Sequence, residues 1–161
     1  MINDILVKQK KELEYLLAKQ YITRHQTASA KKYIENDLVK VVVGPRRAGK
    51  SRFSAHLLKD KMPAYINFDE ESLVKIEDYD ELIKELHALY GDKKYLFFDE
   101  IQNLPNWELF INKLHRQGYN ILLTGSNAKV LSKELATSLA GRHIPIEILP
   151  FNFKEYLRAK E

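Results

Sequence analysis

Residues 44–51 have the types and the spacing of a phosphate-binding loop. They spell GPRRAGKS and match the pattern G-x-x-x-x-G-K-[ST]. Gly44 and Gly49 allow backbone dihedral angles that are closed to other residues, so main-chain N–H groups can approach phosphates closely. Lys50 can bring a positive charge to the β- and γ-phosphates, and Ser51 can offer a hydroxyl to Mg²⁺.

The neighbours of this loop favour nucleotide binding over a purely structural glycine turn. An apolar run at 38–43 predicts a strand before the loop, and residues 52–58 can form a helix after it. The positive end of that helix dipole would point at the same phosphates. The residues expected to contact the nucleotide are Gly44, Pro45, Arg46, Arg47, Ala48, Gly49, Lys50, Ser51 and Arg52.

Three arginines are candidates for stabilising transition-state charge in phosphoryl transfer. Arg46 and Arg47 lie inside the loop, where they could act within the chain or only raise the local positive potential. Arg142 follows a glycine in a predicted loop and could reach the site of a neighbouring subunit in a homo-oligomer. Surface arginines are common, which favours a structural role over a catalytic one for any one of the three.

Two acids follow a second apolar run. Residues 95–98, YLFF, predict a buried strand that ends in Asp99 and Glu100. Open parallel sheets bind ligands at the carboxyl ends of their strands, so both acids are expected beside the nucleotide. Asp99 can hold Mg²⁺ through its water shell, and Glu100 can orient or deprotonate an attacking water.

A small polar residue follows the strand predicted at 120–124. Ser126 is the candidate to hydrogen-bond the γ-phosphate or the attacking water, and Asn127 is the second candidate. The alternative is a helix cap for the helix predicted at 128–136, and one residue can serve both purposes.

The pattern of apolar residues predicts an α/β fold. Strands are expected at 38–43, 64–68, 95–98, 120–124 and 143–149, and helices at 2–21, 27–35, 52–58, 79–90, from 107, at 128–136 and from 151. Strands that alternate with helices indicate a parallel sheet covered on both faces. We expect residues 1–37 to form a helical extension packed on the core, and residues 38–161 to form the nucleotide-binding core.

Composition limits the classes of protein that remain. The 161 residues suit one domain, and the absence of cysteine excludes disulfides and thiolate metal sites, which fits a cytoplasmic setting. No apolar run is long enough to span a bilayer, and the N-terminus lacks a signal-peptide pattern, so no membrane partner is expected. The net charge is +4, and the basic residues are scattered among acidic ones, which favours a solvated face over a nucleic-acid patch.

Taken together, the motifs resemble a family of prokaryotic AAA-type ATPases in the P-loop class. The similar stretches are YITRH, GPRRAGKS, YLFFDEIQNLPNWE, ILLTGSNAKVLSKELATSLAGRHI and LPFNFKEYL. The resemblance implies a P-loop NTPase three-layer sandwich with strand order 5-1-4-3-2, and ATP with Mg²⁺ as ligands. It also implies Lys50 and Ser51 as phosphate and Mg²⁺ contacts, Asp99 as the Walker B acid, Glu100 as the catalytic base and Ser126 as the sensor.

The same resemblance bears on the base site and on the extent of the chain. It implies that residues 21–24 lie near the adenine. Members usually continue into a further C-terminal region, whereas this sequence stops at Glu161 within a helical pattern. We therefore expect this sequence to lack an output domain, either as a shortened form of such a protein or as a reduced relative of the family.

Two functions remain in competition. The first is an ATPase that acts as a motor or switch and hydrolyses the β–γ bond with water activated by Glu100. The second is a nucleotide-dependent regulatory module with little hydrolysis, acting on a protein or nucleic-acid partner. A kinase is less favoured because no acceptor site is evident, and a GTPase because no N-K-x-D motif follows the fourth strand.

Overall fold

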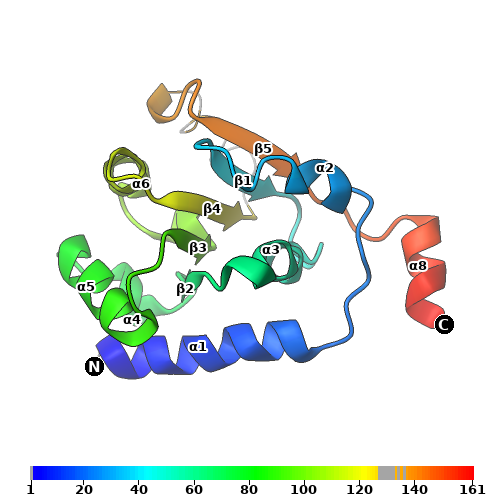
Figure 1. The fold of residues 1–161 in the computed structure, drawn as a ribbon, viewed down its shortest axis with the longest axis horizontal. Coiled ribbons are helices and arrows are strands. Elements are labelled where there is room, and N and C mark those ends of the chain that lie inside the picture. The colour runs from blue at the N-terminus through cyan, green and yellow to red at the C-terminus, as the bar shows by residue number, and fades with distance from the viewer. Residues whose placement is uncertain (1, 127–132, 134, 136) are drawn as a thin grey trace.

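The computed structural model describes residues 2–126, 133, 135 and 137–161 (Figure 1). Asn127 and most of the helix predicted at 128–136 lie outside these residues. The strands are β1 Val39–Val43, β2 Ala64–Asn67, β3 Tyr95–Asp99, β4 Asn120–Gly125 and β5 His143–Glu147. The α-helices are α1 Ile2–Ala18, α2 Thr27–Lys31, α3 Lys50–Leu58, α4 Glu71–Val74, α5 Tyr79–Tyr90, α6 Trp107–Arg116 and α8 Phe153–Lys160, with 3-10 turns η1 Lys59–Lys61 and η2 Ile101–Asn103.

The five strands form one parallel sheet. Their order is β2-β3-β4-β1-β5, which confirms the predicted order 5-1-4-3-2. In such a sheet every strand points the same way, so the carboxyl ends of β1, β3 and β4 meet at one edge. The order places β1, which leads into the phosphate loop, directly between β4 and β5.

Helices cover both faces of the sheet and give the predicted three layers (Figure 1). Alternate residues of each strand point to opposite faces, so the sheet contributes to two separate apolar cores. One core joins Val41, Phe98 and Leu123 to apolar residues of α5 and α6. The other joins Val42 and Leu122 to apolar residues of α2 and α3. No helix within the described ranges combines the length and the apolar character of a membrane span.

Helix α1 runs along the outer side of β2, the strand at one edge of the sheet (Figure 1). Leu6 packs in one core and Leu13 in the other, so the helix bridges the two faces. Between them the side chain of Gln9 is buried and makes two hydrogen bonds with the backbone of Asn67. Gln9 Nε2 donates to the Asn67 carbonyl over 2.8 Å, and the Asn67 amide donates to Gln9 Oε1 over 3.0 Å. The division of the chain at residue 37 stays a prediction.

The predicted helix at 27–35 is wrong in its second half. Helix α2 ends at Lys31, and the chain continues in turns whose amides bond three residues back rather than four. Polar contacts then join this segment to the sheet: Asn120 Nδ2 donates to the Ile34 carbonyl over 2.7 Å, and Lys40 Nζ donates to the Asn36 carbonyl over 2.6 Å. The turns place both carbonyls toward these buried side chains. By contrast, α5 has the bounds predicted for it.

Lys40 carries a testable pH dependence. Its side chain is 1% exposed, and burial lowers its pKa from 10.5 to about 8, against the opposing effect of Asp37 and Glu35. Between these two values the unfolded chain holds a proton that the folded chain has lost, so the free energy of unfolding rises with pH there. The gain is up to roughly 3 kcal/mol. Urea unfolding from pH 7 to 10.5 should show it as a difference between the native chain and Lys40→Met.

The exposed Lys84→Met is the matched control, since it removes the same charge from α5 without a buried group. Its curve should follow that of the native chain. Parallel pH curves for the native chain and Lys40→Met would contradict the assigned burial of the charge.

Gly44 carries a second prediction, on packing. It leaves β1 with φ of 154°, and a Cβ there would fall on the carbonyl oxygen of Ile148, far inside van der Waals contact. Gly44→Ala should therefore lower the free energy of unfolding by roughly 3 kcal/mol or more. Gly118 also has a positive φ, of 87°, but among the described residues no atom beyond its chain neighbours lies within 4 Å of its Cβ position. Gly118→Ala should lose only the roughly 1 kcal/mol of backbone strain. Equal losses in thermal or urea unfolding would refute the role of the Ile148 contact.

Candidate functional site

The phosphate loop joins β1 to α3 at the carboxyl edge of the sheet. Two residues in it have left-handed backbone, Arg47 with φ of 63° and Gly49 with φ of 89°. Gly49 stands just before α3, and no described side chain caps the first turn of that helix, so its amides are left for a ligand. Lys50 is 4% exposed and its Nζ donates to the Pro45 carbonyl over 2.9 Å. The lysine thus lies folded over its own loop.

Asp99 lies at the end of β3 and is only 2% exposed. Three hydroxyls from three elements donate to its carboxylate: Ser51 Oγ from α3 over 3.0 Å, Tyr65 Oη from β2 over 3.2 Å, and Thr124 Oγ1 from β4. Burial raises the pKa of Asp99, and the hydrogen bonds from Thr124, Ser51 and Tyr65 oppose that rise. A cation beside Ser51 and Asp99 would favour the ionised carboxylate further.

Glu100 is held separately from Asp99, although the two are adjacent in sequence. Its backbone is left-handed, with φ of 51°, and its amide donates to Thr124 Oγ1 over 3.0 Å. Its Oε2 accepts from Ser126 Oγ over 2.9 Å and from Gln102 Nε2 over 2.5 Å. Thr124 therefore ties both acids to β4, while their carboxylates have different partners. The arrangement gives Asp99 and Glu100 separate chemical environments.

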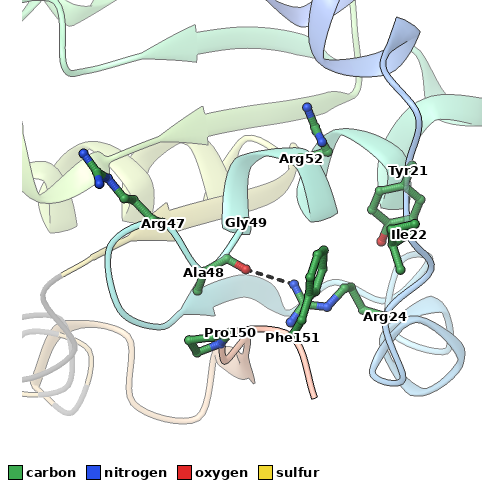
Figure 2. Close-up of a pocket in the computed structure, with 9 residues that line it drawn as sticks. All are labelled: Tyr21, Ile22, Arg24, Arg47, Ala48, Gly49, Arg52, Pro150 and Phe151. Atoms are coloured by element: carbon green, nitrogen blue, oxygen red, sulfur yellow. Dashed lines mark hydrogen bonds between the residues drawn. The ribbon is translucent and has the colours of Figure 1, made fainter. Parts of the chain in front are cut away.

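A cavity of about 400 Å³ opens beside the phosphate loop (Figure 2). Its walls come from the segment between α1 and α2, from the loop and α3, and from the residues just before α8. The lining residues are Tyr21, Ile22, Arg24, Arg47, Ala48, Gly49, Arg52, Pro150 and Phe151. Tyr21 stacks on His56 of α3, with ring centres 4.0 Å apart and an interplanar angle of 8°. The cavity thus combines aromatic and apolar walls with arginines next to a phosphate loop.

The structure brings most of the predicted site residues to one edge of the sheet. Of residues 21–24, predicted to lie near the base, Tyr21, Ile22 and Arg24 line the cavity. Arg46 is exposed. Arg142 precedes β5 and so lies at the amino ends of the strands, opposite the phosphate loop. There its Nη1 donates to Asn112 Oδ1 over 3.3 Å. It is therefore remote from the loop of its own chain, and a role in a neighbouring subunit stays a prediction.

Several residues of the site were not found by sequence reasoning. Thr124 bonds both acids, and its only signal was a hydroxyl near the end of an apolar strand. Gln102 lies two residues after Glu100 on a turn, where polar side chains are common and do not indicate a functional site. Glu155 was also missed; it forms a buried ion pair with Arg24, whose Nε lies 3.2 Å from Glu155 Oε1. The spacing of Asn152 and Glu155 does fit a capping box, which the structure contains, but that pattern does not indicate a distant arginine.

Comparison with known proteins places this geometry in a family. Residues 36–157, more than half of the chain, match the family described as AAA domain. An uncharacterized protein of Methanocaldococcus jannaschii, MJ1544, is 46% identical over 128 residues, covering 76% of this chain and 29% of that protein. An uncharacterized protein of Haemophilus influenzae is 40% identical over 139 residues, covering 78% and 34%. The chain thus spans about a third of the length of these relatives.

Solved structures show the same fold at low sequence identity. The Walker-type ATPase PABY2304 of Pyrococcus abyssi has a TM-score of 0.61 at 19% identity, covering 86% of this chain and 56% of that one. AMPPCP-bound DnaA from Aquifex aeolicus has a TM-score of 0.57 at 16% identity, covering 86% and 51%. With its phosphate loop, its acid pair and its sheet order, the chain belongs to the AAA domain family and is a nucleotide-binding domain of the P-loop ATPase type.

Proposed function

We propose that this domain binds ATP with Mg²⁺ and hydrolyses the β–γ phosphoanhydride bond, as the motor or switch of a longer protein. The observation that carries the proposal is the separation of the two acids. Asp99 Oδ1 lies 3.0 Å from Ser51 Oγ, while the Glu100 carboxylate accepts hydrogen bonds from Ser126 and Gln102. A hydroxyl beside a carboxylate suits a hard cation, and a second carboxylate held apart suits a water molecule.

The residues present fit both groups. Ser51 and Asp99 would hold Mg²⁺, Asp99 through water, and the ion would neutralise charge on the β- and γ-phosphates when bound. The uncapped first turn of α3 and the loop amides offer N–H donors for the phosphates. The cavity next to the loop would take the base between Tyr21 and Ile22 on one side and Phe151 on the other. Adenine is favoured because the similar fold of DnaA binds AMPPCP.

The side chains then divide the work of hydrolysis. Lys50 would leave its bond to the Pro45 carbonyl and place its charge on the β- and γ-phosphates. Glu100 would take a proton from the attacking water, whose oxygen bonds to the γ-phosphorus as the bond to the β-phosphate oxygen breaks. Ser126, which donates to Glu100 Oε2, would orient the carboxylate or the γ-phosphate. ADP and phosphate are the products.

One observation favours the alternative, a nucleotide-dependent binding module with little hydrolysis. Glu100 Oε2 already accepts two hydrogen bonds, from Ser126 and from Gln102. Both compete with water for that oxygen, so the isolated domain would turn over slowly unless a partner or a further part of the protein moves them. Protein and nucleic-acid partners both fit this alternative.

The variant Glu100→Gln tests whether hydrolysis, as distinct from nucleotide binding, depends on Glu100. We expect ATP affinity to stay within about twofold of the native chain and turnover to fall by roughly 10²–10⁴, because the general base is lost while the phosphate contacts remain. Lys50→Ala should weaken binding itself. Isothermal titration with ATP and Mg²⁺, together with phosphate release, measures both quantities.

The exposed Glu81→Gln on α5 is the matched control and should behave as the native chain does. Native protein that binds ATP without releasing phosphate would favour the binding module over the hydrolase. A folded chain that binds no nucleotide would overturn both proposals.

A further inference from the structure

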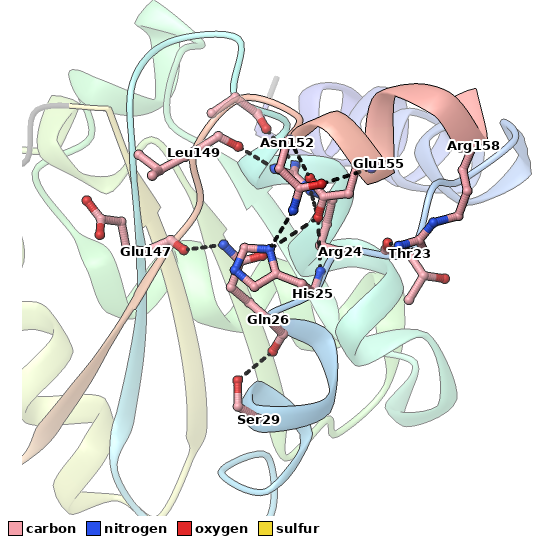
Figure 3. Close-up of polar contacts among 11 residues, drawn as sticks. Thr23, Arg24, His25, Gln26, Ser29, Glu147, Leu149, Asn152, Glu155 and Arg158 are labelled. Atoms are coloured by element: carbon pink, nitrogen blue, oxygen red, sulfur yellow. Dashed lines mark hydrogen bonds and ion pairs between the residues drawn. The ribbon is translucent and has the colours of Figure 1, made fainter. Parts of the chain in front are cut away.

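Arg24 holds three parts of the chain together beside the cavity (Figure 3). Its Nη1 donates to the Ala48 carbonyl in the phosphate loop over 2.9 Å, and its Nη2 donates to the Leu149 carbonyl just after β5. Its Nε lies 3.2 Å from Glu155 Oε1 on α8. The side chain is 4% exposed, so these contacts are shielded from water. One guanidinium therefore connects the loop, the chain after β5 and the last helix.

Helix α8 is attached to the rest of the molecule mainly through one carboxylate. Among its eight residues only Glu155 is buried, whereas Phe153, Tyr156 and Leu157 are exposed. Glu155 also accepts from the backbone amides of His25 and Asn152, each over 3.0 Å. Figure 1 shows α8 at one end of the molecule, next to the segment that joins α1 to α2. With so little apolar contact, the docking of α8 depends on this polar cluster.

The charge of Glu155 is favoured in this position. Burial alone would raise the pKa of its carboxyl, but the two amide hydrogen bonds and the positive charge of Arg24 outweigh burial and lower it. Glu155 thus supplies the negative charge that compensates the buried guanidinium. Removing that partner would leave a buried charge uncompensated, which is strongly unfavourable.

The chain segments that this ion pair connects line the cavity. Tyr21 and Ile22 precede Arg24 in the chain and line one part of the wall, while Pro150 and Phe151 precede α8 and line another. The Phe151 ring centre lies 4.9 Å from Arg24 Cζ, which brings the two parts of the wall into contact. Phe151 lies directly before Asn152, the N-cap of α8, so a ligand that touches both segments is sensitive to whether α8 is docked. Such a ligand binds the docked state better and must shift the equilibrium toward it.

We infer that Arg24 and Glu155 are positioning residues for the proposed nucleotide site, and that nucleotide binding and the docking of α8 favour each other through their ion pair. This inference rests on the proposed nucleotide binding and adds that the site is completed by the last helix. Linkage makes the effect reciprocal: whatever factor docking adds to affinity, nucleotide adds to docking. The relatives are about three times as long as this chain, and α8 lies exposed at one end of the molecule, where a nucleotide signal could pass to another part of a longer protein.

The test uses Glu155→Gln, which keeps the size of the side chain and removes its charge. We expect the dissociation constant for ATP and for ADP to rise roughly tenfold, within the 5–150-fold span of typical couplings. The rate of phosphate release at saturating ATP should change by less than about twofold, because the Glu100 cluster is untouched. In the native chain, nucleotide should slow hydrogen exchange of the α8 amides, and in Glu155→Gln this protection should be lost.

The exposed Glu147→Gln on β5 makes the same chemical change outside the cluster and should bind nucleotide as the native chain does. Arg24→Lys is a second variant, which keeps the charge but loses the branched donor set, and it should weaken binding as well. If Glu155→Gln does not fold, exchange of α8 in the native chain with and without nucleotide still decides the matter.

The outcomes distinguish this inference from the function on which it rests. Native affinity in Glu155→Gln, with a lower melting temperature alone, would show a merely structural ion pair and overturn the coupling while nucleotide binding stands. Exchange of α8 that ignores nucleotide in a native chain that binds it would do the same. No binding by the native chain would overturn the proposed function as well.

Discussion

The carboxylate of Asp99 accepts hydroxyl hydrogen bonds from β2, β4 and α3, and the geometry of the whole site depends on it. A carboxylate this deeply buried is unfavourable unless its oxygens are satisfied, so Tyr65, Ser51 and Thr124 are fixed relative to one another. Thr124 also accepts a hydrogen bond from the Glu100 amide, and Ser51 is the last residue of the phosphate-loop motif, so both are positioned through Asp99. The strands that supply these groups must then be neighbours, as they are in the order β2-β3-β4.

Sequence reasoning located the phosphate loop, the acid pair and the strand order, because each follows from local spacing or from family resemblance. It placed the acids at a strand end, where parallel strands bring distant residues together. Contacts that depend on the packing of remote segments were beyond it. Arg24 and Glu155 lie near opposite ends of the chain, and nothing in either neighbourhood specifies the other. Phe151 lines the cavity because the chain after β5 returns to the phosphate loop, which the local sequence does not indicate.

The errors in element bounds concern segments that contact distant parts of the chain. Residues 32–35 have ordinary helical composition but form turns, in which the Ile34 carbonyl accepts from Asn120. The predicted strand 143–149 ends at Glu147, where the partner strand β1 ends at Val43, and the Leu149 carbonyl accepts from Arg24. Contacts between remote segments are not visible in local propensity.

The pairing of Gln9 with Asn67 has a consequence for the solubility of the folding chain. A parallel sheet exposes unpaired amides and carbonyls along its outer strands, which invites strands from other molecules to add on. Gln9 bonds both backbone polar groups of Asn67 in β2, and α1 shields that strand. At the other outer strand, β5, the Ile148 amide bonds Val43 of β1, so every second amide of β5, counted from Ile148, faces β1. Pro145 is at one of the other positions, whose amides would point outward, and proline has no N–H to offer there. Both margins of the sheet are thus protected against intermolecular β-aggregation, one by a helix and the other by an imino acid.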